Sequence, residues 1–227
     1  MRVLVLVISN DLFPVYAHHR AVWTSYMNSH PNVDCYFITA APLTLVPFIS
    51  SNTLTVRGVE RYGRIFAKTV DALAFALARR EYSYVVRTNL SSVWDFKQLL
   101  TYLETTPRER LYAGHVIVHT TGLPYASGAG ILMSVDVAHT LVATQRLGRT
   151  LAEYDDVTIA AVLAASGLTP QSLPRVDFLS LAHYEAHRDT IPPGSFHYRV
   201  KHENHGGDRM EEPMIMRRLL QEHISTG

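Results

Sequence analysis

The segment FHYRVK, residues 196–201, places three basic side chains at alternate positions, namely His197, Arg199 and Lys201. Alternate residues of a strand lie on the same face, so these side chains would point the same way. Arginine makes forked contacts with phosphate oxygens, and lysine supplies a point charge. The pattern therefore predicts a face that binds a diphosphate, the alternative being a solvated edge strand with scattered basic residues.

A second polar cluster follows an apolar run in VVRTNLSS, residues 85–92; its members are Arg87, Thr88, Asn89 and Ser91. At the carboxyl ends of strands in an open α/β sheet, such side chains line the crevice in which ligands bind. Ser9 and Asn10 follow the first apolar run and would reach the same edge. A buried arginine needs a partner, which favours a binding role for Arg87, whereas Ser92 could simply cap the next helix.

Adjacent carboxylates occur in YDDV, residues 154–157, where Asp155 and Asp156 begin a predicted helix. One carboxylate there can cap backbone amides and interact with the helix dipole, while the other projects into the crevice. A projecting carboxylate can act as a general base. The two open interpretations are therefore acid–base chemistry and capping alone.

Strand-like and helix-like segments alternate along the chain and would position these side chains. We expect strands at 2–8, 33–39, 53–57, 82–87, 110–119, 173–177 and 196–200, and helices at 15–29, 61–79, 95–104, 135–146, 155–166 and 210–223. We also expect a loop rich in Gly and Pro at 120–130, followed by a short apolar strand. The uninterrupted apolar run at 2–8 is typical of a strand covered on both faces. The order predicts an α/β fold with a mainly parallel central sheet flanked by helices, in a single domain over residues 1–227.

The composition excludes some classes of protein. With 21 Lys and Arg against 20 Asp and Glu, the net charge is +1, so we expect no nucleic-acid partner. The only cysteine, Cys35, cannot form an internal disulfide and is expected in the core. No apolar run approaches the roughly 20 residues of a membrane span. We therefore expect no transmembrane segment and a cytoplasmic protein.

Common short fingerprints are missing or incomplete. The sequence contains neither G-x-G-x-x-G nor the P-loop motif, so another nucleotide-binding design is needed. HYEAH, residues 183–187, has two histidines at the spacing of a helical zinc site. A zinc hydrolase would need its glutamate directly after His183, whereas Glu185 comes one residue later. Surface histidines are the favoured interpretation.

Four motifs occur in the order found in the β-1,3-galactosyltransferase-like group of GT-A glycosyltransferases. They are Lys68–Thr69 on a helix, the strand end at 87–91, YASGAG at 125–130 and YDDV at 154–157. The chain also resembles the compact glycosyltransferases with which large DNA viruses build capsid glycans, which share a segment like FHYRVK. The resemblance covers most of the chain. It implies a GT-A (Rossmann-like) fold. It also implies transfer of a sugar, such as glucose or rhamnose, from a UDP-sugar to a hydroxyl of a glycan or glycoprotein. If the protein is viral, this transfer would take place in the host cytoplasm.

The resemblance also implies roles for individual residues. Asp156 would be the general base of an inverting transfer, with Asp155 as its positioning neighbour. The donor nucleotide would contact Ser9, Lys68, Arg87, Thr88, Asn89, Ser91, Arg199 and Lys201. The sugars would contact Tyr125, Ser127, Gly128 and Gly130, since glycines let a ligand approach the main chain. Tyr125 and Trp94 could offer ring faces to a sugar, although aromatic residues more often lie in the core.

The family usually holds Mn²⁺ or Mg²⁺ with an Asp-x-Asp motif at the strand end. Here the matching residues 89–91 read Asn-Leu-Ser, and the sequence has no Asp-x-Asp. Neutral oxygens hold a cation weakly, so we expect a divalent cation to bind mainly through the phosphates of the donor. His197 is the candidate metal ligand of the chain. A related α/β nucleotidyltransferase or hydrolase, and a non-catalytic sugar-binding or assembly module, remain the alternative functions.

Overall fold

The computed structural model describes residues 1–145, 154–202 and 209–224. The larger sheet consists of β1 (Val3–Ile8), β2 (Val33–Ala41), β3 (Phe48–Ser50), β4 (Thr53–Arg57), β5 (Tyr84–Asn89), β7 (Tyr112–Val118), β8 (Pro124–Ser134) and β9 (Gln171–Ser172). Its eight strands follow the order β3-β4-β2-β1-β5-β8-β7-β9. A smaller sheet consists of β10 (Val176–Phe178), β11 (His197–Val200) and β6 (Ser92–Trp94), in that order.

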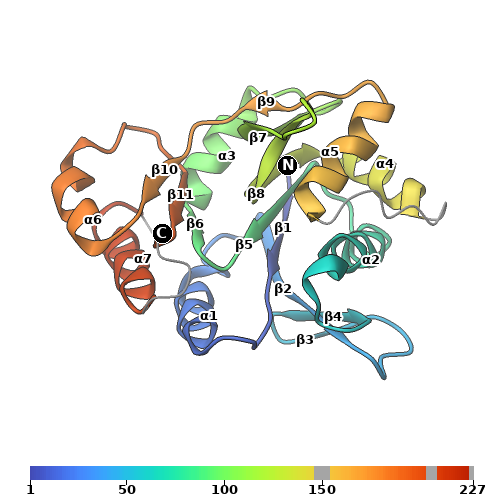
Figure 1. The fold of residues 1–227 in the computed structure, drawn as a ribbon, viewed down its shortest axis with the longest axis horizontal. Coiled ribbons are helices and arrows are strands. Elements are labelled where there is room, and N and C mark those ends of the chain that lie inside the picture. The colour runs from blue at the N-terminus through green and yellow to red at the C-terminus, as the bar shows by residue number, and fades with distance from the viewer. Residues whose placement is uncertain (146–153, 203–208, 225–227) are drawn as a thin grey trace.

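The helices are α1 (Pro14–Tyr26), α2 (Ile65–Leu77), α3 (Phe96–Glu104), α4 (Val135–Gln145), α5 (Asp155–Ala165), α6 (Leu181–His187) and α7 (Glu211–Glu222), with short 3₁₀ turns η1 (Tyr62–Arg64) and η2 (Arg188–Thr190). Most of the helices flank the larger sheet, whereas α6 lies beside α7 and the smaller sheet (Figure 1). All but α6 were expected from the sequence; the last residue of the helix expected at 135–146 lies outside the described residues. None of the described helices is long and apolar enough to cross a membrane.

The first strand is covered on both faces, as its sequence predicts. Val3, Val5 and Val7 belong to one apolar cluster with residues of α1, α3 and α7. Leu4 and Leu6 belong to a second cluster with residues of α2, α4 and α5. Strands β2, β4 and β5 join β1 to make a parallel centre. Their carboxyl ends therefore meet at one edge of the sheet, which confirms the expected α/β architecture.

The expected loop at 120–130 is wrong over most of its length, because β8 begins at Pro124. This strand pairs antiparallel with β5 on one side and with β7 on the other. Its small residues permit close packing: a Cβ on Gly114 of β7 would lie 2.7 Å from the Cβ of Ala126. Sheet pairing on both sides outweighs the local preference of glycine and proline for turns.

The two sheets are joined where β5 leads into β6. Leu90 and Ser91 alone separate the strands, and the indole of Trp23 donates a hydrogen bond of 3.0 Å to the Leu90 carbonyl. Strand β6 then pairs antiparallel with β11. This pairing places the basic segment FHYRVK beside the polar end of β5.

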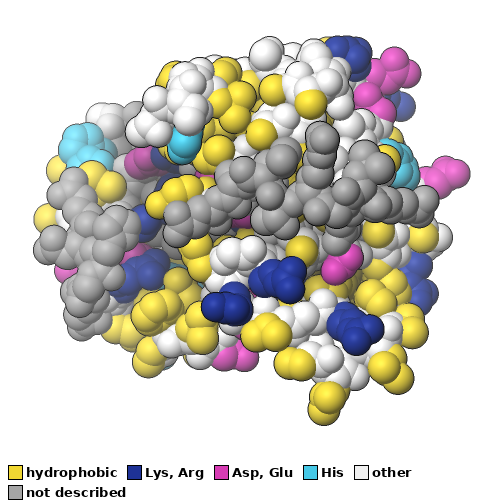
Figure 2. Space-filling view, turned by 45° about the vertical axis from the view of Figure 1, so that its right-hand side comes forward, with side chains coloured by type: hydrophobic (Ala, Val, Ile, Leu, Met, Phe, Trp, Pro, Cys, Tyr) yellow, Lys and Arg dark blue, Asp and Glu magenta, His cyan; other side chains and the backbone are white. Residues whose placement is uncertain are grey.

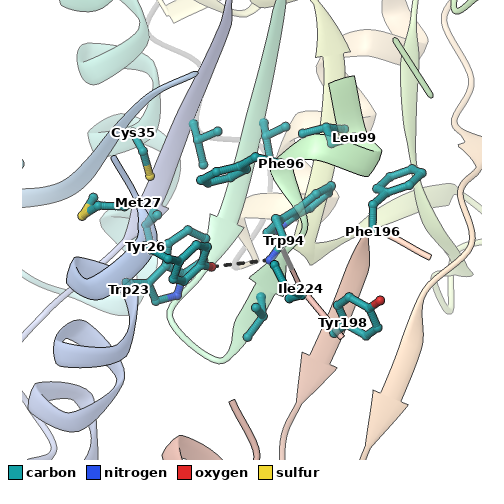
Figure 3. Packing of buried hydrophobic residues seen from close by; sticks show 14 of the residues in the cluster. Trp23, Tyr26, Met27, Cys35, Trp94, Phe96, Leu99, Phe196, Tyr198 and Ile224 are labelled. Atoms are coloured by element: carbon teal, nitrogen blue, oxygen red, sulfur yellow. Dashed lines mark hydrogen bonds between the residues drawn. The ribbon is translucent and has the colours of Figure 1, made fainter. Parts of the chain in front are cut away.

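A single apolar cluster fills the space between α1, β6 and β11 (Figure 3). Trp94 is fully buried in it, and its backbone N–H lies 3.5 Å from the hydroxyl of Tyr26. The sequence allowed Ser92 to cap the next helix, but in the structure it does not. The carboxylate of Asp95 accepts the capping bond, from the N–H of Gln98 at 3.0 Å. Ser92 instead ties β6 to β8 by donating to the Ala129 carbonyl at 2.7 Å.

Candidate functional site

A cavity of about 380 Å³ opens where the carboxyl ends of β1 and β5 face β11 and the start of α5. Many of the residues expected to bind ligands line it: Arg87, Asn89, Ser91, Ser127, Gly128, Asp155, Asp156, Arg199 and Lys201. Asn10, Tyr16, Tyr62 and Arg209 also contribute to its walls. The structure thus brings together four segments that are far apart in the sequence.

Arg87 lies at the floor of the cavity, with 1% of its surface exposed. Its guanidinium donates hydrogen bonds to the carboxylate of Asp155, to the carbonyl of Gly128 and, at 3.2 Å, to the side-chain oxygen of Asn89. Burial raises the pKa of the Asp155 carboxyl above its usual value; the Arg87 charge opposes this shift, and the adjacent Asp156 adds to it. The ion pair satisfies a buried cation and holds the start of α5 against β5.

Asp156 is oriented by backbone donors. One of its carboxylate oxygens accepts a hydrogen bond of 2.9 Å from the Gly128 N–H. The other accepts one of 3.0 Å from the N–H of Val157, in the first turn of α5. The helix is thus stabilised by this carboxylate, which also lines the cavity. Capping and chemistry, the two interpretations from the sequence, are compatible in this residue.

Gly128 is required by close packing in the cavity floor. A Cβ at this position would lie 2.7 Å from a guanidinium nitrogen of Arg87 and 3.2 Å from a carboxylate oxygen of Asp156. Any side chain would therefore displace one of these two charged groups. The glycine also keeps the main chain of β8 exposed to the cavity.

Arg199 and Lys201 form the opposite wall. Within the described residues, neither side chain makes a hydrogen bond or an ion pair, although Arg199 is largely buried. Burial and the neighbouring charge of Arg175 lower the pKa of Arg199 to about 10. Burial and Arg199 itself lower the pKa of Lys201. Each cation thus disfavours the other, and a bound anion would relieve their mutual repulsion.

Arg209 adds a third cation to this wall and was not predicted from the sequence. Its guanidinium makes a two-pronged contact with Glu212, at 2.7 and 2.8 Å. Glu212 is buried, and its carboxylate also lies 3.1 Å from the imidazole of His19. Burial opposes ionisation of Glu212, but hydrogen bonds from His19 and Arg209 outweigh it and lower the pKa of Glu212 to about 2. No short motif signals this network, since His19 lies on α1 whereas Arg209 and Glu212 lie just before and in α7.

Two of the expected nucleotide-binding residues lie behind the cavity. Lys68 is 4% exposed and donates hydrogen bonds to the Glu60 carboxylate, at 2.8 and 3.1 Å, and to the Ser9 carbonyl, at 2.9 Å. The hydroxyl of Ser9 accepts a hydrogen bond of 2.8 Å from Arg20. Neither side chain is part of the cavity wall. The structure instead shows them fixing the carboxyl end of β1, from which Asn10 enters the cavity.

A second group of expected residues packs beneath the wall. Thr88 is buried, donates to the Ala129 carbonyl at 2.6 Å and accepts from the indole of Trp94 at 3.0 Å. The imidazole of His197 stacks on Trp94 with ring centres 4.1 Å apart. A Cβ on Gly130 would lie 2.2 Å from this imidazole, so the glycine makes room for the stack.

These positions revise the expected roles of two aromatic residues. Trp94 cannot offer its face to a sugar, because it is fully buried against His197. Tyr125 is partly buried against an apolar cluster and is not among the residues that line the cavity. His197 is likewise not among the lining residues, and burial lowers the pKa of its imidazole well below the usual value.

The side chains present do not fit a metal ion held by the protein alone. Among the described residues, no three His, Cys, Asp or Glu side chains come together as ligands. Asp155 is paired with Arg87, and Asn89 already accepts a hydrogen bond from the same guanidinium. The cations Arg87, Arg199, Lys201 and Arg209 line the cavity beside only two carboxylates, which makes it repulsive to a free divalent cation.

The architecture is that of a GT-A (Rossmann-like) glycosyltransferase fold. The structure matches a glycosyltransferase involved in the glycosylation of the major capsid of PBCV-1, with a TM-score of 0.59 and 11% identity over 96% of this chain and 99% of that chain. It also matches an active-site mutant of LgtC, with a TM-score of 0.51 and 11% identity over 96% of this chain and 95% of that chain. No family model and no curated protein matches the sequence. The fold expected from the resemblance is thus confirmed.

Proposed function

We propose that the protein is a glycosyltransferase that transfers a hexose from a UDP-sugar to a hydroxyl of a glycan or glycoprotein, with inversion of configuration. The observation that carries this proposal is the cavity at the carboxyl edge of the sheet, with cations on one wall and paired carboxylates on the other. Figure 1 shows β11 and α5, which supply these two walls, on either side of β5. Such an arrangement suits a substrate with a diphosphate at one end and a reacting carbon at the other.

The cationic wall supports binding of the diphosphate. Departure of UDP leaves negative charge on its β-phosphate, and preorganised positive groups stabilise that charge. Arg199, Lys201 and Arg209 are close enough together to line one cavity. Arg209 is held in place by Glu212 before any ligand arrives. These side chains therefore need little reorganisation to receive the phosphates.

The carboxylate wall supports the role of Asp156 as general base. Its carboxylate would accept the proton of the acceptor hydroxyl while the oxygen attacks the anomeric carbon and UDP departs. The hydrogen bond from Gly128 fixes the orientation of the carboxylate. Asp155, neutralised by Arg87, would position Asp156 rather than take the proton itself.

The cofactor proposal follows from the charge balance of the cavity. Mn²⁺ or Mg²⁺ would supply additional neutralisation of the diphosphate, and the donor's own phosphates would provide most of its ligands. Binding of the metal alone would be weak, since Asn89 and Ser91 stand where the family has carboxylates. The cations of the chain would carry most of the diphosphate recognition.

Titrations with UDP and uridine test the nucleotide site. Arg199→Ala and Lys201→Ala should each weaken UDP binding by about 1.5–3 kcal/mol, the range for a hydrogen bond to a charged group. Uridine lacks phosphates and should bind both variants as it binds the wild type. UDP should also bind better than GDP or CMP. If the variants bind UDP normally while chelation of manganese abolishes binding, the proposed diphosphate site is wrong.

Product analysis tests the reaction itself. Asp156→Asn should retain UDP binding and lose turnover by roughly 10²-fold or more, because the amide cannot accept the proton. Release of UDP from the donor supports sugar transfer, whereas release of pyrophosphate from a nucleoside triphosphate would indicate a nucleotidyltransferase. Binding of UDP-sugar without any turnover in the presence of varied acceptors would favour a non-catalytic module. Near-normal turnover of Asp156→Asn, together with abolished turnover of a folded Asp155→Asn variant, would transfer the base assignment to Asp155, whereas loss of folding in either variant would support a capping role.

A further inference from the structure

An exposed apolar surface surrounds one side of the cavity mouth. It is formed by three loops that follow β1, β2 and β4, all of which end at the same edge of the sheet. Its large side chains are Leu12 and Phe13 in the first loop, Leu43, Leu45 and Val46 in the second, and Val59 in the third. We call these three loops the apolar rim. Tyr62, which follows the third loop, is exposed and also lines the cavity, so the rim and the site adjoin.

The second loop of the apolar rim carries large apolar side chains that are unusually exposed. Leu43 is 92%, Leu45 86% and Val46 69% exposed, and the adjoining edge strand β3 is exposed along its whole length. Exposure of single apolar residues is common, but several in succession at a projecting loop mark an interaction surface. Figure 2 shows hydrophobic side chains gathered over β3, β4 and their neighbouring loops.

The exposed charges around the apolar rim are mainly positive. Arg57, Arg61 and Arg64 are exposed, and within the described residues their side chains make no hydrogen bond or ion pair. Glu60 is the only acidic residue between positions 41 and 64, and its carboxylate faces inward to Lys68. In Figure 2, Lys and Arg side chains lie among the hydrophobic ones on this face. Asp11 is the one acidic side chain in the first loop.

We propose that the apolar rim docks the protein onto an anionic lipid bilayer. Leucine, valine and phenylalanine side chains that project from loops can enter the acyl boundary, which removes their apolar surface from water. Arginines beside them would remain at the depth of the lipid phosphates, where each adds attraction to an anionic surface. Bound in this way, the protein turns the mouth of its cavity toward the membrane. The proposal does not depend on the reaction proposed above.

Sedimentation with vesicles tests the docking. The wild type should co-sediment with vesicles of phosphatidylcholine and phosphatidylglycerol, less with phosphatidylcholine alone, and less again when salt screens the charges. Leu43→Ser/Leu45→Ser should lower partitioning by about tenfold or more, because two apolar side chains no longer enter the bilayer. Arg57→Gln/Arg61→Gln should lower it by a similar factor on the mixed vesicles only.

Matched controls separate docking from general effects. Ile117→Ser/Val118→Ser removes two exposed apolar side chains from β7, which five strands separate from the edge strand β3. Arg108→Gln/Arg217→Gln makes the same charge change at exposed positions outside the rim, between α3 and β7 and on α7. Both controls should partition as the wild type does, and urea unfolding should show that every variant is folded. The proposal is overturned if the controls lose as much binding as the rim variants, or if the wild type does not bind mixed vesicles at low salt. Self-association that Leu43→Ser/Leu45→Ser abolishes, without vesicle binding, would instead identify a second copy of the chain as the occupant.

Discussion

The ion pair between Arg87 and Asp155 should be a major determinant of stability. Arg87→Met removes the cation and the hydrogen bonds that its guanidinium donates to the Asp155 carboxylate and the Gly128 carbonyl. Arg87 is 1% and the Asp155 side chain 10% exposed, so water cannot readily replace the lost contacts. Breaking one side of a buried pair costs about 3–5 kcal/mol, and we expect this loss in the free energy of unfolding at pH 7.

A double-mutant cycle measured by urea unfolding isolates the pair. Asp155→Asn alone should also destabilise, because it leaves Arg87 as an uncompensated buried charge. The double variant Arg87→Met/Asp155→Asn should lose less than the sum of the single variants, by about 2 kcal/mol. Arg188→Met is the matched control: its pair with Glu222 is 37% and 33% exposed, so the loss should stay below about 1 kcal/mol. Additive losses in the cycle would refute the coupling.

The pH dependence of Arg87→Met gives an independent check. Without the guanidinium, the main opposition to burial is lost, so burial and the neighbouring Asp156 raise the pKa of Asp155 further above the value in the unfolded chain. The folded variant then binds more protons than its unfolded state as the pH falls toward the range of free carboxyls. Its stability deficit against the wild type should therefore shrink at acidic pH and be fully present at neutral pH. A deficit that stays constant from pH 7 to pH 4 would contradict this account.

Two further predictions concern buried groups away from the reacting centre. Glu212→Gln should destabilise the protein by about 3–5 kcal/mol at pH 7, because Arg209 and His19 lose a buried ionised partner. It should also weaken UDP binding, because Glu212 no longer holds Arg209 in place. Urea unfolding and UDP titration measure the two effects, with the exposed Glu109→Gln as control. Burial raises the pKa of the Cys35 thiol well above its usual value. The thiol should therefore stay protonated and should not react with a thiol reagent at pH 8 until urea unfolds the chain. Stoichiometric labelling of the folded protein would contradict this.

Local sequence patterns predicted much of the framework. The run of valines and leucines at 3–8 identified the central strand, because a parallel strand buried on both faces needs no polar alternation. Arg87 and Asn89 at the end of β5 line the cavity, in line with the general rule for strand ends, whereas Thr88 between them is buried beneath it. Arg199 and Lys201 also line this cavity, whereas His197, which the same alternation placed on their face, is buried against Trp94.

The failures have a common physical origin in distant contacts. Lys68 is turned from the cavity by Glu60 and by the Ser9 carbonyl, neither of which its helical pattern could reveal. The strand over 124–130 forms because β5 and β7 pair with it from both sides. Arg209 is held at the cavity by the carboxylate of Glu212, which in turn contacts His19 of α1. Each case depends on a partner that is distant in the chain or outside the local pattern.

The shared core beside Trp94 bears on how the chain can be shortened. The cluster that contains Trp94 and Phe96 also contains Tyr198, Met216 and Ile224, so the last quarter of the sequence covers apolar side chains of the first half (Figure 3). A fragment that stopped before β10 would keep most of the larger sheet yet expose this surface to water, and it would lack the cationic wall. We therefore expect such fragments to aggregate rather than to survive as a half-site, and the two sheets to unfold in a single transition.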